Sequence, residues 1–111
     1  MSPEDLPPLG RLLSLLEARF ALRVIWALQD GQAQTFRHLQ DSVGGVTPNT
    51  LNTRIKELRE AGLVCHGKSG YLLTELGSHL ASCLNQLPFF ADQWATRLTG
   101  KAATPTTTAL A

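Results

Sequence analysis

The stretch that decides the fold is residues 45–64, which read GVTPNTLNTRIKELREAGLV. Thr47 followed by Pro48 is a strong helix start, because a threonine side chain caps free N–H groups and a proline in the first turn needs no N–H. Apolar residues then recur at spacings of three and four, which predicts a helix over about 48–61 with one buried side. Gly62 supplies the stop signal. The other side of this helix is polar and faces solvent.

Shorter signals on either side of this helix complete a motif. Upstream, Thr35 is a good N-cap for a short helix that Gly44–Gly45 ends. Downstream, residues 63–65 and 71–73 read as two β-strands joined by the tight turn 66–70. Two short helices joined by a glycine-containing turn and followed by a hairpin are the order of a winged helix-turn-helix. The sequence therefore predicts a mainly α fold with a small β-hairpin, of the α+β class.

Long apolar patterns flank the motif on both sides. They predict one helix over about 10–29 and another over 74–98, which Pro88 should kink or divide near Leu87. Together these helices carry more apolar surface than one small domain needs to cover its core. We therefore expect them to be the dimerisation helices of a homodimer. The candidate interface residues are Leu12, Leu16, Phe20, Leu84, Leu87, Phe90 and Trp94.

Length and composition indicate a single globular domain. The chain has 111 residues, of which 43% are hydrophobic and 17% charged, so it resembles neither a disordered protein nor a polycation. We expect an N-terminal loop over 1–9, one folded domain over 10–98 and a flexible Thr/Ala-rich tail over 99–111.

The cysteines and the N-terminus indicate the compartment. Cys65 and Cys83 are too few for a disulfide framework and are expected to be thiols in a reducing environment. The N-terminus is acidic where a signal peptide would be basic, and the longest uncharged stretch, 76–91, contains too many polar residues to span a membrane. The sequence therefore predicts a cytoplasmic protein with no membrane segment.

Polar and basic residues gather where a helix-turn-helix meets DNA. Asn and Thr are poor interior helix formers, and they can bond base edges and phosphates. Cations on the same helix, on the preceding helix and in the hairpin turn can contact phosphates. The candidate DNA contacts are Arg37, His38, Thr47, Asn49, Thr50, Asn52, Thr53, Arg54, Lys56, Lys68 and Ser69.

The charge pattern agrees with DNA binding but leaves an alternative for two cations. The net charge is only +1, yet residues 47–69 hold four cations and two anions. Within the predicted helix, Arg54 can instead pair with Glu57, and Lys56 with Glu60, at spacings of three and four. One protomer would make few phosphate contacts, which also favours a dimer.

Three segments resemble the HxlR-type winged-helix transcriptional regulators of bacteria. They are TFRHLQDSV (35–43), the stretch 45–64 quoted above, and YLLTELGSHL (71–80). The similarity covers most of residues 20–84 and is most specific over 51–64. The resemblance implies a homodimer formed by the first and last helices, with two recognition helices in successive major grooves about 10 base pairs apart. Two features depart from the family pattern: the wing is short, and the cysteine that many members carry ahead of the first helix is absent from residues 1–9.

The sequence thus predicts a sequence-specific double-stranded DNA-binding transcriptional regulator, a homodimeric repressor. One alternative is a winged helix that binds proteins and not DNA, and another is a regulator gated by a small molecule of unknown identity. No phosphate loop, nucleophile motif or carboxylate pair indicates an enzyme, and we expect no cofactor. A ligand pocket and a metal site are less favoured than an aromatic core and unliganded thiols and imidazoles. The residues of the ligand pocket would be Trp26, Phe36, Tyr71 and Trp94. The residues of the metal site would be Cys65, His66, His79 and Cys83.

Overall fold

The structure, a computed structural model, describes residues 7–100. The first six residues of the expected loop and residues 101–111 of the expected tail lie outside this range. Contacts along the chain divide it into two compact units, Met1–Ala81 and Ser82–Ala111. The expected folded range 10–98 takes in residues of both units.

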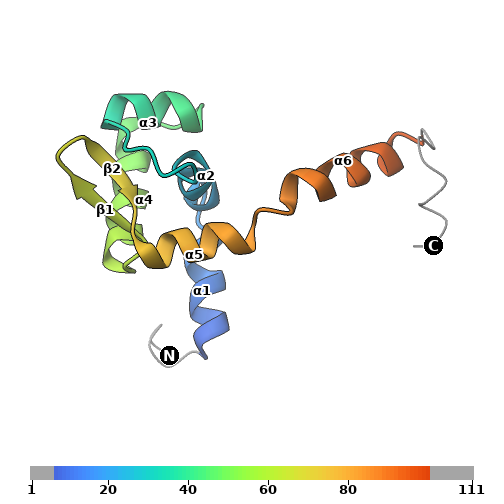
Figure 1. The fold of residues 1–111 in the computed structure, drawn as a ribbon, viewed down its shortest axis with the longest axis horizontal. Coiled ribbons are helices and arrows are strands. Elements are labelled where there is room, and N and C mark those ends of the chain that lie inside the picture. The colour runs from blue at the N-terminus through green and yellow to red at the C-terminus, as the bar shows by residue number, and fades with distance from the viewer. Residues whose placement is uncertain (1–6, 101–111) are drawn as a thin grey trace. The chain divides into compact units, whose positions relative to one another are not determined.

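The described residues are mainly helical, with one antiparallel sheet of two strands. The fold class predicted from the sequence is confirmed. In chain order (Figure 1) the elements are α1 (Pro8–Leu16), α2 (Ala21–Ala27), α3 (Phe36–Val43), α4 (Pro48–Glu60), β1 (Val64–Gly67), β2 (Gly70–Leu73), α5 (Glu75–Cys83) and α6 (Leu87–Leu98).

The core of the first unit is formed mainly by α2, α3 and α4. These three helices lie together with the hairpin in Figure 1. Burying one large aliphatic side chain stabilises the fold by about 1.5–3 kcal/mol, so this cluster holds the two short helices of the motif in place. Its fully buried large side chains are Val24, Ile25, Leu28, Leu39, Leu51, Ile55 and Leu58.

The prediction of one helix over 10–29 is wrong. α1 begins at Pro8, inside the predicted loop, because proline fits the first turn of a helix, and it ends at Leu16. The chain then turns, with Phe20 in the left-handed conformation at φ 72°, before α2 begins at Ala21. The apolar spacing continues through this junction and therefore hides it. A bulky residue in this conformation costs about 1–2 kcal/mol, so tertiary contacts must hold the junction.

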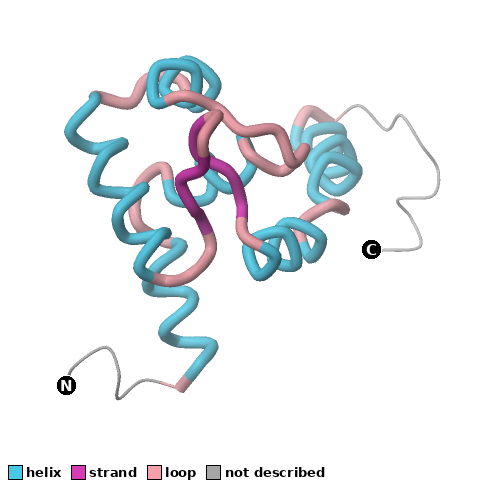
Figure 2. Tube along the Cα trace, turned by 60° about the vertical axis from the view of Figure 1, so that its left-hand side comes forward, coloured by secondary structure: helices cyan, strands magenta, loops and turns pink. Residues whose placement is uncertain are grey.

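The hairpin has longer strands and a shorter turn than predicted. β1 and β2 pair from Val64 opposite Leu73 to Gly67 opposite Gly70, and only Lys68–Ser69 remain as the turn. Figure 2 shows the two strands side by side in magenta. Gly70 closes the turn at φ 130°, a conformation that glycine adopts without steric cost.

Gln34 ties this hairpin to the helices. Its backbone N–H donates to the carbonyl of Tyr71 at 2.9 Å, and its carbonyl accepts from the Tyr71 N–H at 2.7 Å. Its buried side chain donates from Nε2 to the carbonyl of Ala27 and accepts from the Ser42 hydroxyl, both at 2.9 Å. One residue thus fixes the hairpin relative to α2 and α3.

The prediction that Pro88 divides the last helical run is confirmed. α5 ends at Cys83, and α6 begins at Leu87 with Pro88 in its first turn. A proline there loses no hydrogen bond, whereas inside a continuous helix it would remove one and clash with the preceding turn.

The start of α5 is fixed to the turn that follows α4. Thr74 caps the helix, since its Oγ1 accepts from the Gly77 N–H at 3.0 Å, and the same hydroxyl donates to the carbonyl of Gly62 at 2.6 Å. The Thr74 N–H donates to the carbonyl of Leu63 at 3.0 Å. This close approach leaves no space for a side chain at Gly77.

Candidate nucleic-acid interface

The outer face of α4 is defined by Asn49, Asn52, Thr53 and Lys56. These residues recur at spacings of three and four, and all are exposed. They lie opposite the buried side chains of the same helix because a helix repeats every 3.6 residues. Thr47 begins the helix as predicted, since its Oγ1 accepts from the Thr50 N–H at 3.3 Å.

Some hydroxyls in this region already have partners inside the protein. Thr53 Oγ1 donates to the carbonyl of Asn49 at 3.0 Å, and Thr47 Oγ1 donates to Thr50 Oγ1 at 3.0 Å. By contrast, no residue within 7–100 engages the side-chain amides of Asn49 and Asn52 or the ammonium of Lys56. Those three groups are free to bind an external partner.

A hollow of about 560 Å³ lies between α4 and the hairpin. Its polar lining comes from Asn52, Lys56, Arg59 and the acidic Glu60 on α4, and from His66 and Tyr71 on the strands. The rings of His66 and Tyr71 stack with their centroids 4.3 Å apart. Arg59 and His66 were not among the predicted DNA contacts. Arg59 could have been found from its place three residues after Lys56 on the same helix. His66 fell in the predicted turn, and only the longer strands of the structure bring it opposite Tyr71.

Two further groups of predicted contacts lie at the edges of the motif. Lys68 and Ser69 are exposed and form the whole hairpin turn. Arg37 and His38 are exposed in the first turn of α3, where the Thr35 side chain caps the His38 N–H at 3.1 Å. All four remain predicted contacts in positions open to solvent.

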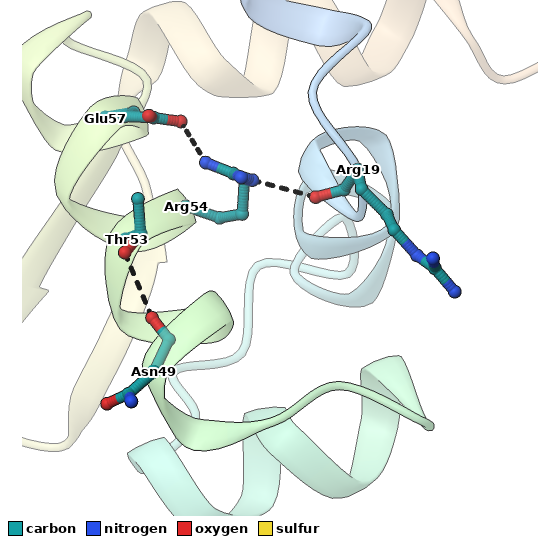
Figure 3. Close-up of polar contacts among 5 residues, drawn as sticks. All are labelled: Arg19, Asn49, Thr53, Arg54 and Glu57. Carbon is teal, nitrogen blue, oxygen red and sulfur yellow. Dashed lines mark hydrogen bonds and ion pairs between the residues drawn. The ribbon is translucent and has the colours of Figure 1, made fainter.

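Arg54 is set apart from the other candidates. Its side chain is only 19% exposed and points to the junction between α1 and α2. Nε donates to the carbonyl of Arg19 at 2.8 Å, and Nη1 donates to Glu57 Oε1 at 2.6 Å (Figure 3). The alternative pairing with Glu57 is therefore confirmed. The corresponding pair of Lys56 with Glu60 does not form in the part of the chain that the structure describes.

The predicted dimerisation surface is exposed more on α6 than on α1. Leu16 and Phe20 pack partly against the core of their own unit. Leu12 and Leu84 are half-buried, whereas Leu87, Phe90 and Trp94 are exposed. On α1 the exposed apolar residues are Leu9 and Leu13, which the prediction did not include.

The structure also places the residues of the less favoured ligand pocket and metal site. Phe36 and Tyr71 pack against the core, Trp26 is half-buried, and Trp94 belongs to the second unit. Cys65 and Cys83 are free thiols. Within residues 7–100, no three His, Cys, Asp or Glu side chains gather as a metal site would require. None of the described helices has the length and apolar character to span a bilayer.

Comparisons with known proteins give the family. The family model described as "Methanogenesis regulatory protein FilR1, N-terminal domain" matches residues 9–89. An HTH-type transcriptional regulator of Halalkalibacterium halodurans is 31% identical over 87 residues, which are 72% of this chain and 77% of the relative.

Solved structures agree with this assignment. The crystal structure of a possible HxlR family transcriptional factor from Thermoplasma volcanium is similar, with a TM-score of 0.71 and 28% identity over 81% of this chain and 86% of the other. Quinone-bound YodB from B. subtilis gives a TM-score of 0.70 and 27% identity over 79% of this chain and 99% of the other. The resemblance seen in the sequence is confirmed. This chain belongs to the family of the FilR1 N-terminal domain and is a DNA-binding winged helix-turn-helix transcriptional regulator of the HxlR type.

Proposed function

We propose that the protein is a homodimeric repressor that reads duplex DNA with α4 in the major groove. The observation that carries this assignment is the outer face of α4, where Asn49, Asn52 and Lys56 are exposed and have no partner among the described residues. Amide side chains pair with adenine through its N6 and N7 atoms, and a lysine reaches guanine or a phosphate.

The surroundings of α4 supply contacts to the DNA backbone. Arg59 and His66 line the hollow beside Lys56, and Lys68 forms the wing tip. Arg37 lies in the first turn of α3, where free N–H groups also favour an anion. Glu57 is neutralised by Arg54 and therefore repels the phosphates less than its place in the sequence suggests.

Two protomers are needed because one offers few cations for phosphates. The exposed apolar residues of α6 in one unit, and those of α1 in the other, each offer a surface that a second copy can cover. A dimer on a promoter represses transcription by occupying the DNA, which requires no further activity. This role involves no catalysis, and a protein bound to chromosomal DNA acts in the cytoplasm of a bacterium.

Selection of bound fragments from a random duplex pool tests the proposal. We expect enrichment of a site with two-fold symmetry and half-sites about 10 base pairs apart. Failure to enrich any sequence would reject the proposal and favour the alternative of a winged helix that binds proteins.

Lys56→Ala should weaken binding to all DNA sequences. The loss of one phosphate contact should reduce the slope of log K against log salt concentration by about one per protomer. Fluorescence anisotropy titrations at several salt concentrations measure both quantities. Arg23→Ala is the matched control, because Arg23 is an exposed cation on α2 outside the candidate interface. An unchanged slope for Lys56→Ala would remove Lys56 from the contacts.

Asn52→Ala should relax the preference at one base position of each half-site. A good bidentate contact from an amide is worth about 1–3 kcal/mol of discrimination, and alanine cannot make it. Repeating the selection with the variant measures the change. Asn85→Ala removes an exposed amide outside α4 and should leave the selected site unchanged. An equal loss of affinity for all sequences would show that Asn52 reads no base.

A further inference from the structure

The geometry points to Arg54 as a positioning residue: its bonds to Arg19 and Glu57 fix α4 against the α1–α2 junction, so that Arg54 sets the orientation of α4 without touching DNA. This inference rests on the proposed function, in which α4 enters the major groove. Arg54 was among the predicted direct contacts to DNA, and it now has an indirect role instead.

Arg54 lies on a different side of α4 from the outer face. Residues two apart on an α-helix are separated by about 200° around its axis. Arg54 and Lys56 therefore point to different sides of α4. Lys56 is exposed on the outer face, whereas Arg54 is mostly covered and lies beside the buried Ile55 and Leu58. A helix that presents Lys56 to DNA turns Arg54 away from it.

The Arg54 guanidinium already binds two groups within the protein. Nε binds the carbonyl of Arg19, 35 residues away in the sequence, and Nη1 binds the carboxylate of Glu57 on the next turn of α4. Figure 3 shows the guanidinium between these two groups. Two bonds from one planar group fix its orientation in a way that a lysine ammonium cannot reproduce.

The segment that Arg54 binds has an unfavourable backbone conformation. The Arg19 carbonyl comes directly before Phe20, whose φ of 72° is unfavourable for an aromatic residue. Phe20 packs partly against the core, and the Arg19 guanidinium lies 5.0 Å from the centre of its ring. Arg54 thus binds the chain at the bend where α1 departs from α2. Through this bond the direction of α1 and the direction of α4 are linked.

The link matters because α1 carries exposed apolar residues that the proposed dimer would cover. If α1 joins two protomers, the angle between α1 and α4 sets how far apart the two recognition helices lie. Loosening the link would weaken simultaneous binding to both half-sites while leaving every phosphate contact in place.

Arg54→Lys and Arg54→Gln test the inference together, with binding to the selected duplex measured by anisotropy at several salt concentrations. We expect both variants to lose affinity about equally, roughly tenfold, because each loses the charge-assisted pair of bonds. The salt slope of both should stay that of the wild type. For a direct phosphate contact, Arg54→Lys would keep most of the affinity and Arg54→Gln would lower the slope by about one per protomer. That pattern would overturn the inference.

Hydrogen exchange measured on the full chain supplies a second readout that does not depend on DNA. The Ala21 N–H, bonded to the carbonyl of Ala18 at 3.0 Å, reports on the junction. In Arg54→Lys it should exchange faster, whereas the core amides of Leu39 and Leu58 should keep their rates. Uniformly faster exchange would show a loss of overall stability and would overturn the inference.

Lys56→Ala separates this inference from the proposed function. If the wild type binds the selected duplex, and if Lys56→Ala and Arg54→Gln both lower the slope of log K against log salt concentration, only the inference about Arg54 fails. If the wild type selects no duplex, the proposed function fails and the inference fails with it.

Discussion

Gly77→Ala should lower the free energy of unfolding by about 3 kcal/mol, an unusually large loss for the addition of one methyl group. A Cβ at this position would lie far inside van der Waals contact with the carbonyl oxygen of Leu63, and 3.2 Å from Leu73 Cδ2. The Leu63 carbonyl cannot move freely, since it accepts the hydrogen bond of the Thr74 N–H. The added methyl group would therefore force the start of α5 away from the turn after α4.

The sign of this effect is diagnostic. In an open helix, replacing glycine with alanine stabilises by roughly 0.5–1 kcal/mol, so a large loss must come from the close approach. Thermal unfolding followed by circular dichroism should show a fall in Tm of roughly 15 °C.

Gly31→Ala is the matched control for this prediction. Gly31 has φ +82° with no atom within 4 Å of a built Cβ, so only the backbone conformation is penalised, by about 1 kcal/mol. If Gly77→Ala raised Tm or left it unchanged, α5 would not lie against Leu63 as the structure places it.

The parts of the fold that the sequence predicted correctly have local causes. The Thr35 and Thr47 caps and the position of Pro48 act within a few residues and mark the starts of α3 and α4. The buried stripe of α4 follows from helical spacing alone. Pro88 divides the last helical run through its own missing N–H.

The parts that the sequence missed depend on contacts between distant residues. The bend at Phe20 carries no glycine or proline signal, and the residue that binds the adjoining carbonyl, Arg54, is 35 positions away. The hairpin extends to Gly67 and Gly70, and it is anchored where Gln34 pairs with Tyr71. No local pattern specifies either contact.

Part of the candidate site could be predicted from the sequence. The exposure of Asn52 and Lys56 follows from their positions on the helix relative to the buried residues. The same geometry places Arg54 beside the buried stripe, so its separation from the other cations could have been read from the spacing. The group that Arg54 binds could not be predicted from the sequence, because its position depends on the path of the chain before α2.

Phe90→Ser combined with Trp94→Ser should convert the proposed dimer into a monomer. Both side chains are exposed on α6, which has no buried residue, so the substitutions should leave the fold of each protomer intact. In a two-fold interface each substitution is counted twice. Covering an aromatic side chain contributes at least about 1.5 kcal/mol, so the dimer should lose about 6 kcal/mol or more, roughly 10⁴-fold in Kd.

DNA binding should fall together with dimerisation. When two half-sites are bound by linked protomers, the second contact is intramolecular and raises the apparent affinity by about 10²–10⁴-fold. The double variant should lose this factor on the symmetric duplex selected by the wild type. Its affinity for a single half-site should stay unchanged, because α4 and the hairpin are not altered. Sedimentation velocity gives the mass of the protein, and anisotropy gives both affinities.

Phe89→Ser is the control, because Phe89 is the same residue type as Phe90 and at least as exposed, 66% against 57%. On a helix Phe89 lies about 140° from Trp94 and about 160° from Leu87, so it points away from the line that Leu87, Trp94 and Leu98 form. An interface on that line should tolerate Phe89→Ser with little change in mass or affinity. If the double variant remained dimeric, α6 would not be the interface. If Phe89→Ser dissociated the dimer equally well, the whole surface of α6 would be covered in the dimer, and the interface would not be confined to one face.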